Sequence, residues 1–127
     1  MNKKIRGVCA ATAKGVLCLV LFVACSGSAQ DESAASTEKG RQLYLRNGCA
    51  VCHGDEGGGD GRLAATLKPP PRDFKKVAAY KKGATVAEIA QTIGKGLAGT
   101  SMPAFAHISA ADRLEIARYI AGLQKGP

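Results

Sequence analysis

Residues 49–53 of this chain read Cys49-Ala50-Val51-Cys52-His53, and this short stretch decides the fold. On one helical turn, positions i, i+3 and i+4 project to the same side. Two thiols and an imidazole therefore point in one direction, which is the arrangement that c-type haem attachment requires. The stretch predicts one covalently attached haem c, with thioether bonds from Cys49 and Cys52 and with His53 as a ligand of the iron.

Two other sites also use a Cys-x-x-Cys pair, namely redox dithiols and zinc sites. A redox dithiol would call for a strand-helix-strand context, and a zinc site for a second pair of ligands elsewhere. After Cys52 the chain has no further cysteine and only one further histidine, His107. The haem interpretation is therefore preferred over both.

The beginning of the 127-residue chain has the pattern of an export signal. Residues 1–24 combine a basic start with an apolar run from Gly15 to Ala24, which is the length of a signal-peptide core. The run is too short to span a bilayer as a helix. We therefore expect a signal peptide over residues 1–24, export to the bacterial periplasm, and a single domain in what remains.

Two processing sites compete at the end of the signal. Residues 22–25, Phe-Val-Ala-Cys, resemble a bacterial lipobox in which Cys25 carries a lipid, although Phe22 replaces the usual leucine. Residues 27–29, Gly-Ser-Ala, would instead release a soluble periplasmic protein. We favour a lipoprotein anchored through Cys25, and we favour the outer membrane because Ser26 is not the aspartate associated with inner-membrane retention.

The segment after Cys25 is polar and rich in small residues, and it has too little apolar content to pack. We expect residues 25–35 to be a flexible tether and residues 36–127 to be the haem domain. Cysteine usage agrees with this division, because Cys9 and Cys18 belong to the signal, and Cys25 is either lipidated or removed. No cysteine remains for a disulfide framework.

The formal net charge of +8 overstates the basicity of the mature protein. From Cys25 onward, 14 basic and 10 acidic residues leave a net charge of +4. The basic residues do not alternate with aromatic ones, so nucleic-acid binding is not expected. Residues 68–82 carry a net charge of +5 and form a candidate docking patch for proteins, although a solvated charged face is the commoner use of such a run.

Three longer helices are expected, and no segment alternates long enough to predict a strand. The first spans residues 36–47, with Ser36 as its N-cap and Gly48 at its end. Capping boxes at residues 85–88 and 109–112 open the other two. Their apolar residues recur at helical spacing: Ile89, Ile93 and Leu97 in one, and Ile116, Tyr119, Ile120 and Leu123 in the other.

Two loops have candidate roles beside the haem. Residues 54–61 are rich in glycine and are expected to pass over one haem edge, with a calcium site through their carboxylates as an alternative. Prolines 69–71 leave their carbonyl groups free, and one of these could accept a hydrogen bond from the second ring nitrogen of His53. The alternative for the prolines is an ordinary rigid surface turn.

Met102 is the candidate for the second iron ligand. It is the only methionine left once Met1 is removed, and it lies on a loop of glycine and proline rather than on an apolar helical face. A methionine that merely fills a core would be expected on such a face. His107 is the alternative distal ligand.

Taken together, these features resemble class I (monohaem) bacterial cytochromes c over residues 36–123. The resemblance implies an all-α cytochrome c fold of three to five short helices wrapped around one haem c. It also implies that the first and last helices cross near a right angle, with Gly40 of one against Tyr119 of the other. In this family His53 corresponds to the proximal ligand and Met102 to the distal one. The proline segment departs from mitochondrial-type relatives, because it lies further from His53.

A histidine and a methionine together occupy both axial positions of the iron, so no position is left for a substrate. We therefore expect a monomeric electron carrier rather than an enzyme, docking with redox partners near an exposed haem edge. The alternatives are a haem subunit of a larger oxidoreductase, and a gas-binding or peroxidase haem protein with a displaceable distal ligand. The expected lining of the haem pocket is Leu67, Phe74, Ile93, Leu97 and Phe105.

Overall fold

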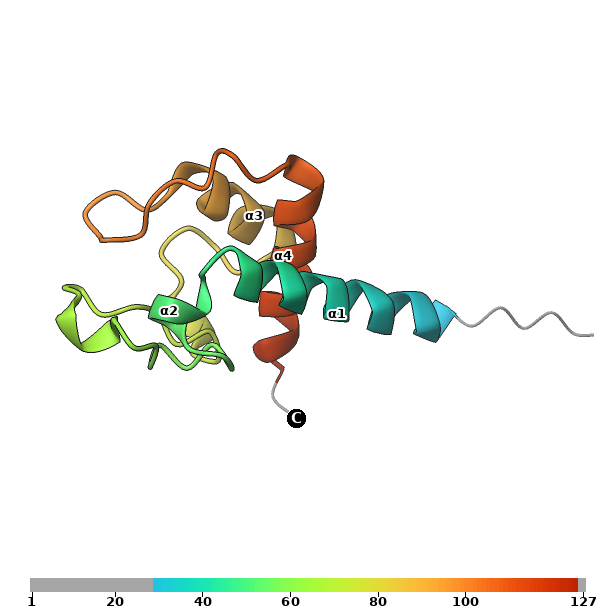
Figure 1. Ribbon diagram of the computed structural model, residues 1–127, viewed down its shortest axis with the longest axis horizontal. Coiled ribbons are helices and arrows are strands. Elements are labelled where there is room, and N and C mark those ends of the chain that lie inside the picture. The colour runs from blue at the N-terminus through green and yellow to red at the C-terminus, as the bar shows by residue number, and fades with distance from the viewer. Residues whose placement is uncertain (1–28, 126–127) are drawn as a thin grey trace, which may run out of the picture.

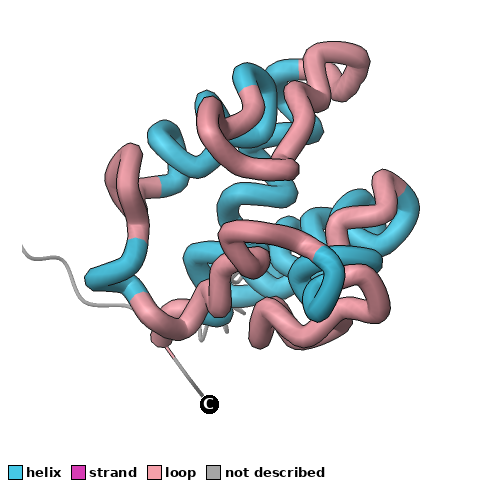
Figure 2. Tube along the Cα trace, turned by 90° about the vertical axis from the view of Figure 1, so that its left-hand side faces the viewer, coloured by secondary structure: helices cyan, strands magenta, loops and turns pink. Residues whose placement is uncertain are grey.

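The computed structural model describes residues 29–125 of the chain. This part consists of helices and loops, and it contains no strand (Figure 2). The all-α prediction is therefore confirmed. The α-helices are α1 (Ala29–Arg46), α2 (Ala50–His53), α3 (Val86–Lys95) and α4 (Ala110–Leu123), and the 3-10 helices are η1 (Ala64–Thr66) and η2 (Val77–Ala79).

Helix α1 begins earlier than predicted. It starts at Ala29 rather than after Ser36, so the predicted N-cap is wrong, and residues 29–35 of the expected tether are helical. The polar composition of this segment removes a reason to pack but not the tendency to form helix, because alanine and glutamate are good helix formers. The predicted signal peptide over residues 1–24 and the lipidation site Cys25 lie outside the described residues.

Helices α1 and α4 cross steeply, and their contact forms the centre of the molecule (Figure 1). At the crossing, a Cβ atom on Gly40 would collide with the backbone carbonyl of Glu115 and come within 2.9 Å of the Tyr119 Cβ atom. Only glycine allows the two backbones to approach this closely. The Gly40–Tyr119 contact that the family resemblance implied is thus present in the structure.

The core combines residues of α1, α3 and α4. Tyr44 of α1 is fully buried, and its ring centroid lies 5.4 Å from that of Tyr119. Burial of such apolar and aromatic surface is the main stabilising contribution to a domain of this size. The buried residues are Leu43, Tyr44, Phe74, Ile89, Ala90, Ile93, Ile108, Ile116, Ala117, Tyr119 and Ile120.

The N-caps predicted at Thr85 and Ser109 are confirmed, but only the first forms the full capping box that was predicted for both. At α3 the Thr85 hydroxyl accepts a hydrogen bond from the Glu88 N–H (3.3 Å), and the Glu88 carboxylate accepts one from the Thr85 N–H (3.0 Å). At α4 the Ser109 hydroxyl accepts from the Asp112 N–H (3.1 Å). The Asp112 carboxylate accepts from the Ser109 hydroxyl itself (2.9 Å), since aspartate is one methylene shorter than the glutamate of a full capping box.

Helix α2 and the loop that leads into α4 lie on the same side of the α1–α4 crossing, with α2 at the lower left and the loop at the upper left (Figure 1). Helix α3 packs against α4 behind this loop. Of the helices in residues 29–125, none has the length and apolar character needed to cross a membrane.

Candidate haem-binding site

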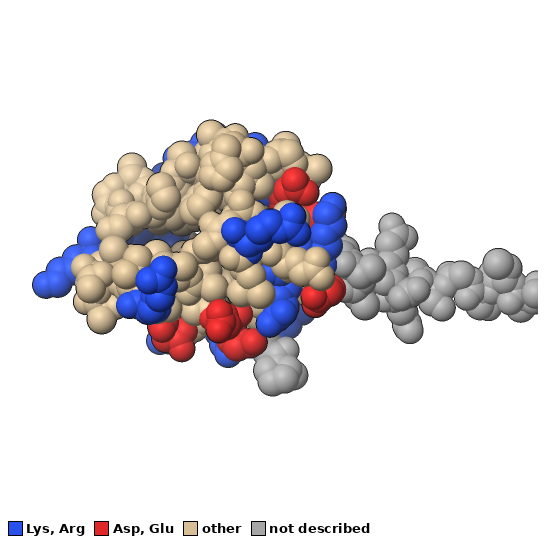
Figure 3. Space-filling view, viewed as in Figure 1, with Lys and Arg blue, Asp and Glu red and all other residues tan. Residues whose placement is uncertain are grey.

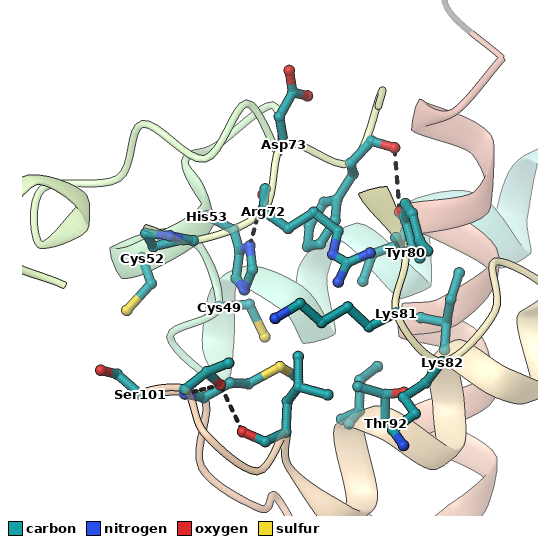
Figure 4. Close-up of a pocket in the computed structure, with 18 of the residues that line it drawn as sticks. Cys49, Cys52, His53, Arg72, Asp73, Tyr80, Lys81, Lys82, Thr92 and Ser101 are labelled. Carbon is teal, nitrogen blue, oxygen red and sulfur yellow. Dashed lines mark hydrogen bonds between the residues drawn. The ribbon is translucent and has the colours of Figure 1, made fainter. Parts of the chain in front are cut away.

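A predominantly apolar cavity of about 280 Å³ lies between α2 and the loop before α4. Figure 3 shows the molecule hollowed at this place, and Figure 4 shows residues that line the hollow. The cavity brings together the predicted haem residues Cys49, Cys52, His53 and Met102, and the whole expected lining of Leu67, Phe74, Ile93, Leu97 and Phe105.

Helix α2 presents the attachment residues on one turn. Cys49 is its N-cap, and the His53 N–H donates to the Cys49 carbonyl at 2.9 Å, so the three side chains share one face. Both thiols are free and partly buried. Burial raises the pKa of the Cys49 thiol to about 11, so that the sulfur is neutral at pH 7 and adds no charge to an apolar cavity.

The His53 ring is oriented by a backbone carbonyl, as predicted, but not by one of the proline carbonyls. Its Nδ1 lies 3.1 Å from the carbonyl oxygen of Arg72, the residue that follows the proline run. The Phe74 N–H donates to the Gly57 carbonyl (2.8 Å), which holds the chain after the prolines against the loop that follows α2. The prediction for prolines 69–71 is therefore wrong by one residue.

This hydrogen bond also decides the chemistry of His53. A carbonyl can only accept, so Nδ1 carries the proton and Nε2 keeps a free lone pair for a metal. Burial lowers the pKa of His53, which favours the neutral imidazole that metal binding needs. Phe74 stacks on the ring, with 4.5 Å between centroids and 20° between planes, and thereby limits its rotation.

A ring of pairwise contacts joins His53 to Arg72, Arg72 to Tyr80, Tyr80 to Phe74, and Phe74 back to His53. Figure 4 labels His53, Arg72 and Tyr80. The Tyr80 hydroxyl donates to the Phe74 carbonyl (3.2 Å), and the Arg72 guanidinium lies over the Tyr80 ring at 4.3 Å from its centroid. Sequence reasoning missed these roles of Arg72 and Tyr80. The only available signal was the closeness of both residues to the proline run.

The end of α2 is held by two tyrosines from the crossing helices. The Tyr44 hydroxyl of α1 donates to the Gly54 carbonyl at 2.6 Å, and the Tyr119 hydroxyl of α4 donates to the Asp55 carbonyl at 3.1 Å. Burial raises the pKa of Tyr44 well above its usual value, so this hydroxyl keeps its proton and remains a donor.

Met102 lies on the other side of the cavity. It is partly buried against the core, and Figure 4 shows its neighbour Ser101 across the cavity from His53. The Met102 N–H donates to the Thr100 hydroxyl (3.2 Å), and the Met102 carbonyl accepts from the Leu97 N–H (3.2 Å). His107, the alternative distal ligand, is exposed and is not among the residues that line the cavity.

Residues 54–61, which were expected to pass over a haem edge, are not among the residues that line the cavity, and they form no evident metal site. Within residues 29–125, no three or more His, Cys, Asp or Glu side chains group so as to bind a metal ion. The alternative calcium ligands Asp55, Glu56 and Asp60 thus form no such group. Asp60 instead packs its carboxylate against Gly54 and Gly58 of the same loop.

The donor set fits a haem c. Two thiols can form the thioethers, an imidazole with a free Nε2 can bind the iron on one side, and a thioether sulfur stands on the other side. The remaining walls are mostly apolar, which suits the porphyrin ring. When bound, such a group supplies one-electron redox chemistry at its iron.

Comparison with known proteins agrees with this geometry. The cytochrome c family model matches residues 37–124, which include the whole haem motif and Met102. No curated protein sequence matches the chain. A chain of the Kuenenia stuttgartiensis reducing HAO-like protein complex has a similar structure, with a TM-score of 0.62 and 30% sequence identity. The match covers 70% of the present chain and 44% of that one, so the present chain spans less than half of its length.

The family match extends over well more than half of the chain and coincides with the described helical domain. This chain therefore belongs to the cytochrome c family and carries covalently bound haem c.

Proposed function

We propose that the protein is an exported carrier that passes single electrons between protein partners, with His53 and Met102 as the two axial ligands of its haem iron. The observation that carries this proposal is that both side chains line one apolar cavity, from segments on either side of it. An iron with both axial positions filled by the protein has no position left for a substrate. Such a site favours electron transfer over catalysis.

Charge around the cavity supports docking with protein partners. Lys76, Lys81 and Lys82 line the cavity and are exposed, and Val77 beside them is an exposed apolar residue (44%). A cationic rim attracts acidic surfaces over a distance of about one Debye length, roughly 10 Å at 0.1 M salt. We expect brief, salt-sensitive encounters with acidic partner proteins at this rim.

A second candidate is a haem subunit of a larger oxidoreductase. It is favoured by the structural similarity to a chain of a protein complex from Kuenenia stuttgartiensis. Size-exclusion chromatography of native, detergent-solubilised extracts distinguishes the two candidates. A carrier elutes as a small species, whereas a subunit elutes with a larger assembly and carries other polypeptides with it.

The axial ligands are tested by the absorption spectrum of the ferric holoprotein. A methionine sulfur on ferric haem iron produces a charge-transfer band, and we expect this band in the unmodified protein and its loss in Met102→Ala. His107→Ala is the matched control and should retain the band. The carrier proposal fails if the unmodified protein lacks the band or if its ferrous form binds carbon monoxide readily.

Export and lipid attachment rest on the sequence. We propose that the mature protein is a periplasmic lipoprotein anchored through Cys25, with the outer membrane as the favoured location. Mass spectrometry of the mature protein tests this, because cleavage, acylation and haem attachment each change the mass. A mature chain that begins at Gln30 without lipid would show the soluble periplasmic form instead.

A further inference from the structure

Arg72 has a donor that none of the described residues satisfies. Its Nη1 atom is buried and lacks a hydrogen-bond partner. Other parts of Arg72 have partners: its carbonyl accepts a hydrogen bond from His53, and its guanidinium lies over the Tyr80 ring. A buried guanidinium N–H normally has a partner, and a charged acceptor is the strongest one.

Among residues 29–125, no carboxylate pairs with this guanidinium. The only carboxylate among the residues that line the cavity is that of Asp73. It interacts instead with the Lys76 ammonium (3.6 Å) and with the Lys75 N–H (3.0 Å). The cationic residues that line the cavity are Arg72, Lys76, Lys81 and Lys82, so this wall has an excess of positive charge.

The guanidinium is also held in place for a planar partner. Tyr80 covers one face, and the Tyr80 hydroxyl is itself fixed by the Phe74 carbonyl. Figure 4 shows the guanidinium beside Tyr80 at the edge of the cavity, next to Lys81. A stacked guanidinium keeps its N–H groups in its own plane, where they match the two oxygens of a carboxylate.

We infer that Arg72 positions the haem by binding one of its carboxylate groups through the guanidinium, while its carbonyl holds His53. One residue then fixes both the imidazole and the carboxylate-bearing edge of the haem. This assignment rests on haem binding and on the contacts of Arg72, and it does not depend on whether the protein is a free carrier or a subunit.

The test compares full-length holoprotein carrying Arg72→Gln with the unmodified protein. The primary readout is the bending band of the haem carboxylates in the resonance Raman spectrum, whose frequency rises when these groups accept hydrogen bonds. We expect the band to shift downward in Arg72→Gln. Lys75→Gln is the matched control, because it removes an exposed cation that does not line the cavity, and it should leave the band unchanged.

The reduction potential provides a second readout. Removing the cation leaves the carboxylate charge uncompensated, which favours ferric iron, so Arg72→Gln should lower the potential. The difference should persist at high salt better than any change in Lys75→Gln, because Arg72 is partly buried and Lys75 is exposed. A purely structural role of Arg72 would alter stability and leave the carboxylate band in place.

The assignment is overturned if the band is the same in Arg72→Gln and the unmodified protein, or if it shifts only in Lys81→Gln. Should Arg72→Gln fail to accumulate as holoprotein, Arg72→Lys decides the question. Lysine keeps the charge but lacks the planar guanidinium that can donate to both carboxylate oxygens. The band should therefore still shift downward, but by less than if the contact were lost completely. An unchanged band in Arg72→Lys would again overturn the assignment.

Discussion

The two walls of the haem cavity are held in different ways. On the His53 side, the contacts join distant parts of the chain: the Tyr44 and Tyr119 hydroxyls bind the loop after α2, and the Arg72 carbonyl binds the imidazole. On the Met102 side, most hydrogen bonds stay within residues 97–102. The main tie to the helices is the Phe105 N–H, which donates to the Ile93 carbonyl at 2.9 Å.

This difference indicates which side of the cavity should open first when the protein is destabilised. Segments with few long-range contacts open at lower free energy than segments tied into the core. The Met102 loop should therefore detach before the His53 side does. With the proposed ligation, the contacts on the His53 side hold the proximal ligand, and the Met102 loop is the part that can detach while the domain stays folded.

The largest effect should come from the attachment residues on the proximal wall. In the double variant Cys49→Ser, Cys52→Ser no thioether can form, so covalent haem should be lost completely. Haem staining of the protein on a denaturing gel measures this directly. Cys25→Ser is the control and should keep the stain, and a stained double variant would show that the motif does not attach the haem.

Alanine variants of two phenylalanines, one in each wall, compare how much each wall contributes to the free energy of unfolding. Phe74 is buried and stacked on His53, whereas Phe105 on the distal side is only partly buried. Phe74→Ala should lower the free energy of unfolding by about 3–5 kcal/mol, the usual range for a buried phenylalanine, and Phe105→Ala by clearly less. Chemical denaturation of each holoprotein supplies the values, and equal losses would remove the proposed difference between the walls.

The helix crossing supports the proximal wall, because it carries Tyr44 and Tyr119. Gly40→Ala places a methyl group against the Glu115 carbonyl and should cost about 1–3 kcal/mol of stability. Gly122→Ala on α4 is the control, since no atom lies within 4 Å of its added Cβ atom, and it should stabilise by about 0.5–1 kcal/mol. Thermal unfolding compares them, and a neutral Gly40→Ala would mean that the crossing can relax.

The smallest effect is expected in the distal loop. The Thr100 hydroxyl donates to the Leu97 carbonyl (2.7 Å) and accepts from the Met102 N–H, so Thr100→Val should cost about 1 kcal/mol. If this loosens Met102, external imidazole should bind the ferric protein about fivefold more tightly. Thr100→Ser retains the hydroxyl and should bind like the unmodified protein. An unchanged affinity in Thr100→Val would show that the loop holds Met102 by other means.

Local sequence patterns predicted the structural features that depend only on neighbouring residues in the chain. The caps at Thr85 and Ser109 depend on residues within one turn, and both are present. The N-cap at Ser36 was wrong because a polar segment can still be helical, and α1 begins at Ala29. The residues that line the cavity could be predicted as a group, because apolar residues in a short haem domain have few other places to be buried.

Contacts between distant segments were less accessible from the sequence. The acceptor for His53 was expected among prolines 69–71, but it is the Arg72 carbonyl, because Phe74 packs on the imidazole and sets the path of the chain. Nothing in the order of residues indicates that the Tyr44 hydroxyl reaches the Gly54 carbonyl.

The sequence by itself determined the haem-attachment motif at residues 49–53, because two thiols and an imidazole need only one helical turn to share a face. It also determined that Gly40 meets the last helix, through the family that the chain resembles. Only the tertiary structure decided which carbonyl orients His53 and where Arg72 places its unpaired donor. These depend on packing between segments far apart in the chain, and no local spacing encodes that packing.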